Sequence, residues 1–207
     1  MAVDFNALAK DWDLDPEKVE RAKVTAELIE KRATVTKETT ALEYGCGTGQ
    51  VSFFLQPKLK EITLADDSEG MLEVLRDKIK SAGVDNMKTL MADFSKDALP
   101  NEKYDLIYIS MTLHHIIDAD SVLRAFHSLL KPGGSLCIAD FDKDDGSFHA
   151  NHEGFEGHHG FERKELSDML SKTGFKDAKF EECFKIMKEV DGKEREFPVF
   201  FVHCTRA

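Results

Sequence analysis

Long apolar runs, paired cysteines and an excess of positive charge are all missing from this chain of 207 residues. No stretch approaches the roughly 18 consecutive apolar residues that span a bilayer, so insertion into a membrane is not expected. The amino terminus, Met-Ala-Val-Asp-Phe-Asn, lacks the basic region and apolar core of a secretion signal. The cysteines are scattered and form no C-x-x-C pair: Cys46, Cys137, Cys183 and Cys204. These absences predict free thiols and a reducing, cytoplasmic setting.

The charge balance argues against another class of partner. Lysine and arginine number 28, against 39 aspartates and glutamates, and the formal net charge is −11. Nucleic-acid binding depends largely on neutralising phosphates, and here the lysines alternate with acids instead of forming a basic stripe. We therefore expect a small-molecule partner and no nucleic acid. With 42% hydrophobic and 32% charged residues, the chain has the composition of one globular domain, expected to be a monomer or homodimer.

The most informative segment that is present reads Leu-Glu-Tyr-Gly-Cys-Gly-Thr-Gly and begins at Leu42, after a β-prone run. Its glycines alternate, at Gly45, Gly47 and Gly49. Glycine has no Cβ and tolerates positive φ, so the backbone can turn sharply and lie against a ligand. A loop of this kind between a strand and a helix is typical of nucleotide-binding α/β proteins. A dinucleotide fingerprint, however, needs its third glycine at position 50, where this chain has Gln50.

Segments with helical and strand periodicity alternate along the chain. Helices are expected at 16–33, 48–56, 71–82, 122–130 and 162–172. Strands are expected at 39–44, 61–66, 87–92, 104–110 and 135–140, and then at 177–190 and 195–205. The last two strands flank Asp191-Gly192, a strong hairpin signal. Because alternating strands and helices build parallel sheets through right-handed crossovers, we predict an α/β fold. It is a Rossmann-like, seven-stranded, mostly parallel sheet with helices on both faces and a C-terminal antiparallel hairpin.

The alternate glycines, with an acid two residues before the first, resemble motif I of the class I S-adenosylmethionine (SAM)-dependent methyltransferases. The resemblance extends over residues 36–207 and includes Asp66-Asp-Ser-Glu-Gly-Met-Leu72, Met91-Ala-Asp-Phe94 and Lys131-Pro-Gly-Gly134. The last of these is expected to end a helix and reverse the chain. In overall style the sequence is similar to ubiquinone and menaquinone C-methyltransferases. The resemblance implies SAM as cofactor, methyl transfer to an O, N, S or C atom of a small molecule, and a last strand inserted beside the fifth.

The resemblance also assigns cofactor-binding residues, which follow the carboxyl ends of strands, where open α/β sheets bind their ligands. Glu43 is expected near the ammonium and sulfonium of the methionine moiety. Asp66, 21 positions after Gly45, is expected to bind the ribose hydroxyls, with Asp67 as the alternative acid and Ser68 as a helix cap. Met71 belongs to the same segment.

Two further cofactor contacts are implied. Asp93 is expected to accept a hydrogen bond from the adenine amino group, and the backbone N–H of Phe94 is expected to meet the adenine ring. An Asp93 that only caps a turn is the alternative. The backbone carbonyl of Ser110 is expected to touch the methionine moiety.

Histidines follow on the side where the family places the methyl acceptor. His114 and His115 come directly after the strand at 104–110 and are candidate catalytic residues, because an imidazole can accept the acceptor's proton near neutral pH. Simple packing, or a hydrogen bond to a loop carbonyl, is the other interpretation.

A second histidine-rich segment runs from Phe148 to Phe161. Its polar residues are His149, His152, Glu153, Glu156, His158 and His159. They are compatible with a divalent metal site, with the lining of an acceptor pocket or with a polar loop. Because no paired cysteines accompany them, we assign no metal ligand set.

The expected layout is one domain in three parts: a helical lid at 1–35, a SAM-binding core at 36–140 and an acceptor-facing part at 141–207. Trp12, the single tryptophan, is expected either to cover the ligands or simply to pack. Two other functions share these features, namely an NAD(P)-dependent oxidoreductase and a non-catalytic SAM-binding module. Gln50, the terminal hairpin and the Ala-Asp-Phe step disfavour the oxidoreductase.

Overall fold

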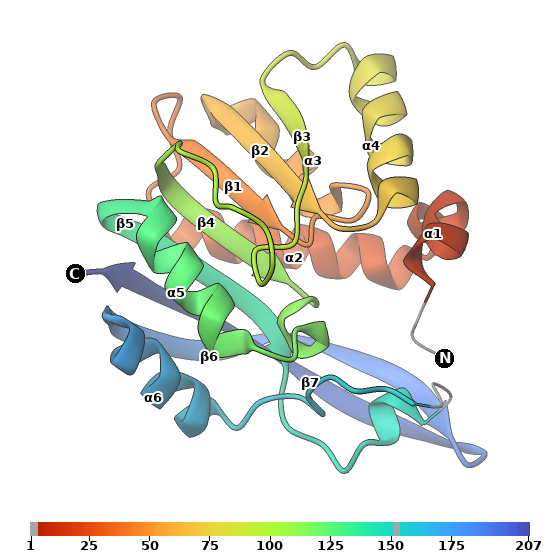
Figure 1. Cartoon of the computed structure of the whole chain (residues 1–207). Helices are drawn as coiled ribbons and strands as arrows, with labels where there is room; N and C mark the ends of the chain where they lie inside the picture. The colour runs from red at the N-terminus through yellow and green to blue at the C-terminus, as the bar shows by residue number, and fades with distance from the viewer. Residues whose placement is uncertain (1–3, 151–153) are drawn as a thin grey trace.

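The computed structural model describes residues 4–150 and 154–207, so His152 and Glu153 lie outside the described residues. The described chain forms a seven-stranded sheet in the order β3-β2-β1-β4-β5-β7-β6 (Figure 1). The strands are β1 Thr40–Tyr44, β2 Glu61–Asp66, β3 Met87–Met91, β4 Tyr104–Ser110, β5 Leu130–Phe141, β6 Phe175–Val190 and β7 Lys193–Arg206. β1 to β5 are parallel, whereas β7 is antiparallel to both β5 and β6. The predicted fold class is confirmed, including the position of the last strand.

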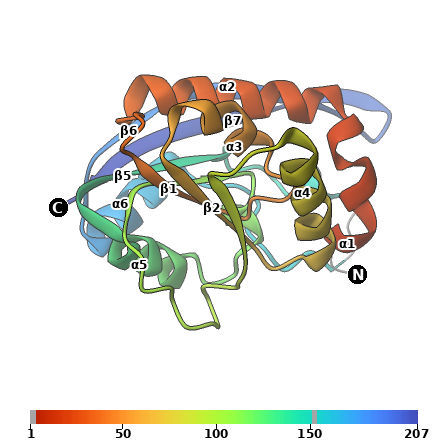
Figure 2. The ribbon, with the colours of Figure 1, turned by 90° about the horizontal axis from the view of Figure 1, so that it is seen from above.

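Helices cover both faces of the sheet, as Figure 2 shows. The α-helices are α1 Phe5–Leu8, α2 Pro16–Arg32, α3 Gln50–Leu55, α4 Glu69–Ala82, α5 Ala119–Leu129 and α6 Arg163–Thr173. Short 3-10 helices are η1 Ala9–Leu14, η2 Gln56–Lys58, η3 Leu113–His115 and η4 Ser147–His149. α2, α3 and α4 bury Ile29, Leu55 and Leu72 against one face, and α5 and α6 bury Phe126 and Leu166 against the other. Each such side chain contributes roughly 1.5–3 kcal/mol, so two apolar layers hold the sheet firmly beneath its loops.

The alternation of side chains along β1 prepares the site. Successive residues of a strand point to opposite faces. Leu42 and Tyr44 pack on the α5 side, and Ala41 packs on the side of α2 and α3. By the same alternation Glu43 points to the face of Ala41, so its carboxyl group is buried beneath α3.

Helix ends follow local sequence signals. Asp15 caps α2 by accepting a hydrogen bond from the backbone N–H of Glu17 at 3.0 Å, with Pro16 at the first position. Ser68 caps α4 by accepting from the backbone N–H of Met71 at 3.3 Å. The predicted cap at Ser68 is confirmed. The helix expected from residue 48 begins only at Gln50, because Gly49 before it adopts a left-handed conformation.

The segment Lys131-Pro-Gly-Gly134 lies at an irregular start of β5. The preceding helix ends at Leu129, and β5 begins at Leu130, five residues before the expected position 135. Pairing with β4 is interrupted across the segment, because Leu130 pairs with Tyr104 and the next paired residue is Ser135, opposite Leu106. Gly133 has a φ of +76°, a left-handed conformation that favours glycine. The helix therefore ends before this segment as predicted, and the early start of β5 rests on the single pair of Leu130 with Tyr104.

The terminal hairpin turns where it was predicted to turn. Asp191 and Gly192 have φ of +51° and +74°, the pair of left-handed residues that a tight two-residue hairpin requires. Among the described residues, no helix has the length and apolar character needed to cross a membrane.

Candidate cofactor and acceptor site

The glycine loop lies at the carboxyl end of β1, and all three glycines have positive φ: +65° at Gly45, +52° at Gly47 and +76° at Gly49. A Cβ on Gly45 would lie 2.2 Å from the Thr112 side chain, and one on Gly49 would lie 2.7 Å from Leu75. A Cβ on Gly47 would meet nothing closer than 3.9 Å. Gly45 and Gly49 are therefore required by packing, whereas a Cβ on Gly47 would make only ordinary van der Waals contact with Met71 and Trp12.

Asp66, at the end of β2, holds this loop. Its Oδ2 accepts a hydrogen bond from the backbone N–H of Gly47 at 2.7 Å, and its Oδ1 accepts from the backbone N–H of Ser68 at 2.9 Å. Burial raises the pKa of the Asp66 carboxyl. The neighbouring Asp67 is exposed. Of the two acids, Asp66 is thus the one joined to the glycine loop, and its contact with ribose stays a prediction.

Glu43 lies behind the loop, with 3% of its surface exposed. Its Oε2 accepts a hydrogen bond from the hydroxyl of Ser52 on α3, which is also within 2.5 Å of the Tyr108 hydroxyl. Burial raises the pKa of Glu43 to about 8, so this side chain carries a proton at neutral pH. The expected contact with the methionine ammonium stays a prediction.

Asp93 and Phe94, assigned to adenine from the sequence, both have partners within the chain. Asp93 accepts from the backbone N–H and the hydroxyl of Ser95, at 2.9 and 2.6 Å, and from Lys96 Nζ at 2.6 Å. Burial alone would raise the pKa of Asp93, but these hydrogen bonds lower it. The backbone N–H of Phe94 donates to the hydroxyl of Tyr44 at 3.0 Å. Adenine would therefore compete with contacts that already exist.

The exit of β4 is tied to the same loop. The hydroxyl of Thr112 is 3.0 Å from the carbonyl of Ser110 and 3.2 Å from that of Gly45. Met111 between them has a φ of +52°, which is unusual for a residue with a side chain. Ser110 thus lies beside the glycine loop, as its assignment to the methionine moiety requires.

The amino-terminal segment is docked onto the loop. Asp13 accepts hydrogen bonds from the Thr48 hydroxyl at 2.5 Å, from Gln50 Nε2 at 2.8 Å and from Lys78 Nζ at 2.5 Å. These bonds lower its pKa against the opposing effect of burial. Trp12, next to it, is also near the loop: its Nε1 would lie 3.9 Å from a Cβ at Gly47. Sequence reasoning missed Asp13, since a single acid outside any motif carries no periodic signal.

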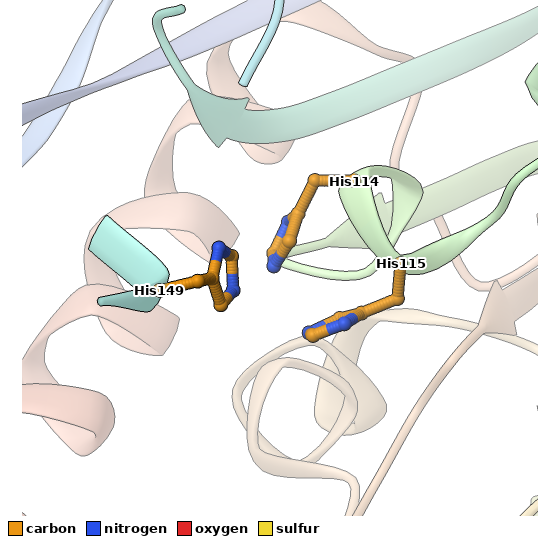
Figure 3. Close-up of side chains that lie close together, drawn as sticks. All are labelled: His114, His115 and His149. Atoms are coloured by element: carbon orange, nitrogen blue, oxygen red, sulfur yellow. The ribbon is translucent and has the colours of Figure 1, made fainter. Parts of the chain in front are cut away.

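The histidines form the second half of the site (Figure 3). His114 is buried, and its Nδ1 lies 2.7 Å from Oδ1 of Asp140, a fully buried carboxylate near the end of β5. His149, from η4, comes to the same place, and nitrogens of His114, His115 and His149 all lie within 4.8 Å of one another. Sequence reasoning named the three histidines separately and missed Asp140, although that acid ends a strand as Asp66 does.

The remaining residues of the histidine-rich segment lie elsewhere. His158 fastens the segment to η3, since its backbone N–H donates to the carbonyl of His114 at 2.7 Å and its Nε2 is 3.0 Å from the carbonyl of Ile116. Glu156 and His159 are exposed. Of the described histidines in this segment, only His149 joins the pair after β4.

Comparison with known proteins finds a matching domain family over part of the chain. Residues 41–134, which contain the glycine loop and η3, match the model of a methyltransferase domain. An uncharacterised methyltransferase of Schizosaccharomyces pombe is 28% identical over 151 residues, covering 66% of this chain and 53% of that protein. The ubiquinone/menaquinone biosynthesis C-methyltransferase UbiE of Vibrio vulnificus is 35% identical over 106 residues, covering 49% of this chain and 41% of UbiE. The chain thus spans about half the length of these relatives.

Solved structures share the fold at low sequence identity. The putative methyltransferase in a complex with the Trm112 activator of Haloferax volcanii is 16% identical, with a TM-score of 0.79 and coverage of 100% of this chain and 99% of that one. The N-methyltransferase NodS of Bradyrhizobium japonicum, solved with S-adenosyl-L-homocysteine, is 18% identical, with a TM-score of 0.67 and coverage of 94% and 91%.

The fold is Rossmann-like, and residues 41–134 match a methyltransferase domain. The matches support a class I SAM-dependent methyltransferase with SAM as its cofactor.

Proposed function

We propose that this chain transfers a methyl group from SAM to a small-molecule acceptor and releases S-adenosylhomocysteine. The observation that carries the proposal is the hydrogen bond between Asp66 and Gly47. This bond links the end of β2 to the glycine loop after β1. Both residues lie within the region that matches a methyltransferase domain. Because Gly47 has no Cβ, a ligand can approach the backbone of this loop closely.

In this proposal the cofactor lies along the carboxyl edge of β1 to β4. The cofactor lies against the glycine loop, which contains Gly45, Gly47 and Gly49. Asp66 accepts hydrogen bonds from the ribose hydroxyls through the lone pairs that its bonds to the chain leave free. Asp67 and Met71 lie next to the ribose. At the adenine end Asp93 and the backbone of Phe94 exchange their present partners for the base. At the methionine end the carbonyl of Ser110 and the carboxyl of Glu43 offer oxygen atoms to a group carrying an ammonium and a sulfonium.

The reaction itself is an in-line displacement, in which the acceptor's nucleophile forms a bond to the methyl carbon as the bond from carbon to sulfur breaks. SAM is already a strong electrophile, so the chain contributes mainly alignment and the exclusion of water. His114 and His115 lie on the acceptor side of Ser110, and we assign them to the acceptor, whose proton they would accept.

We assign each of the three predicted parts of the chain its own role in this reaction. Residues 1–35 act as a lid, 36–140 as the SAM-binding core and 141–207 as the acceptor-facing part of one domain. The docking of Asp13 on Thr48 supports the lid, and the arrival of His149 beside His114 supports the acceptor-facing role. We further propose a cytoplasmic monomer or homodimer that works without nucleic acid or membrane insertion; the net charge of −11 supports the absence of nucleic acid.

A release assay tests the function. The protein is incubated with SAM and panels of phenols, enols, amines and thiols, and S-adenosylhomocysteine is quantified against a reaction without acceptor. We expect release above this baseline with at least one class, and markedly less release with Asp66→Ala at a SAM concentration below saturation. Turnover of NAD(P) with an alcohol or ketone panel, with no release of S-adenosylhomocysteine, would instead identify an oxidoreductase.

A further inference from the structure

We propose that His114, His115 and His149 bind one divalent metal ion of the zinc type. The three side chains come from two short helices, η3 and η4, that are far apart in the sequence. Ring centroids lie 4.0 Å apart for His114 and His115, 5.3 Å for His114 and His149, and 5.6 Å for His115 and His149. Figure 3 shows the three rings converging on one region.

Asp140 supplies the outer-shell partner that metal-binding histidines usually have. Its Oδ1 lies 2.7 Å from Nδ1 of His114, and its Oδ2 accepts from the backbone N–H of the same residue at 3.1 Å. A histidine that donates its Nδ1–H to a carboxylate keeps its Nε2 lone pair for a metal, and its ring orientation is fixed. The carboxylate also adds negative charge close to the ion.

The spacing fits an ion after a small contraction. One nitrogen from each ring lies within 4.8 Å of the others. Zinc binds histidine nitrogen at about 2.0–2.1 Å, so two nitrogens on one tetrahedral ion lie about 3.4 Å apart. Movement of the rings of His115 and His149 by up to roughly 1.4 Å would close this difference, while Asp140 holds the ring of His114.

Aromatic side chains surround the cluster. His149 stacks on Phe155, with ring centroids 3.8 Å apart and an interplanar angle of 9°. The rings of Phe141 and Phe5 lie 4.8 Å from His114 and 5.2 Å from His115, respectively. An apolar wall limits water and strengthens the attraction between an ion and its ligands. Packing alone accounts for stacked rings, but not for three converging imidazoles with a carboxylate behind one of them.

Three protein ligands leave a coordination position for water or for a substrate atom. If the proposed methyl transfer holds, an acceptor oxygen, nitrogen or sulfur could occupy that position and lose its proton to solvent under the influence of the ion. His114 and His115 would then serve the metal and would not accept the acceptor's proton. The existence of the metal site itself does not depend on methyl transfer.

Metal titration tests the proposal. Untagged full-length protein, stripped with a chelator, is titrated with Zn²⁺ by calorimetry and with Co²⁺ by visible absorption. We expect one ion per chain and Co²⁺ bands typical of a nitrogen-ligated site of low coordination number. His149→Ala and His115→Ala should each weaken Zn²⁺ binding more than about 100-fold, and Asp140→Asn about 10–100-fold, as is typical of outer-shell changes. The matched control is His127→Ala on α5, which should bind Zn²⁺ as the wild type does.

The proposal is overturned if the wild type binds no stoichiometric Zn²⁺, or if His115→Ala and His149→Ala bind it as tightly as His127→Ala. Circular dichroism and thermal unfolding check that each variant folds. His115 is partly exposed, so its variant provides the test even where His149→Ala fails to fold. SAM titrated into the same stripped samples reports on the proposed cofactor separately, so that failure of one proposal is distinguishable from failure of the other.

Discussion

The carboxylate of Asp66 and the backbone N–H of Gly47 are joined by a hydrogen bond of 2.7 Å, which links the end of β2 to the loop that follows β1. The same carboxylate also accepts from Ser68, the cap of α4. One buried acid therefore fixes the glycine loop and the start of the next helix relative to each other. The chain's own hydrogen bonds therefore shape the candidate cofactor site.

Replacing this acid should damage binding more than replacing its neighbour. We expect Asp66→Ala to destabilise the fold by about 1–3 kcal/mol, because two buried N–H groups lose their acceptor. We also expect SAM affinity to fall at least about tenfold, which corresponds to a loss of roughly 1.4 kcal/mol. Calorimetry and urea unfolding measure the two effects. Asp67→Ala is the control, and a larger loss of SAM affinity in that variant would contradict the assignment.

The three glycines should respond differently to alanine. Each substitution places a side chain in the left-handed region, at a cost of roughly 1–2 kcal/mol. Gly45→Ala and Gly49→Ala add clashes with Thr112 and Leu75, so both should unfold at clearly lower temperature. Gly47→Ala should lose only the backbone cost in stability but should bind SAM markedly more weakly. Equal thermal destabilisation of all three variants would contradict this difference between Gly47 and the other two glycines.

Glu43 should give the fold a particular pH dependence. Its pKa is about 8 in the folded chain, because of burial, and near 4.5 when unfolded. Below pH 4.5 both states carry the proton; between 4.5 and 8 the unfolded state loses it first, so this contribution to stability falls as pH rises. Urea unfolding at pH 5, 6, 7 and 8 should therefore show Glu43→Gln gaining stability relative to the wild type with rising pH. Parallel curves for the two proteins would rule this out.

The proposed lid, residues 1–35, can be followed through Trp12, the single tryptophan. Trp12 is near Gly47, and Asp13 anchors the segment to Thr48, Gln50 and Lys78. We expect SAM to shift or quench Trp12 fluorescence. Asp13→Ala should release the lid and speed SAM dissociation in stopped-flow experiments. Asp11→Ala, one residue before Trp12, is the comparison, and equal dissociation rates in the two variants would argue against the anchor.

The fold was predictable because its signals are local. Alternating periodicity, Ser68 before α4 and Asp191-Gly192 in the hairpin each specify a short segment, and the sheet follows from their order. The boundary of β5 was not predictable. Leu130 pairs with Tyr104 before the irregular segment that contains Pro132 and Gly133, and no local sequence signal marks that single early pair.

The glycine loop and the histidine cluster also differ in how far the sequence predicts them. The glycine loop is contiguous, so its sequence identifies it directly. The cluster of His114, His149 and Asp140 depends on three elements meeting at one point, and no spacing in the sequence encodes that meeting. The histidine-rich segment suggested His149, His158 and His159 as one group, yet hydrogen bonds of His158 to the backbone separate them.

The central claim, that this chain is built to bind SAM, is tested most directly by titrating the purified protein with SAM and with NAD in the calorimeter. We expect saturable binding of SAM with one site per chain, weakened in Asp66→Ala, and no measurable heat of binding with NAD. Saturable binding of NAD, with none of SAM, would contradict the account.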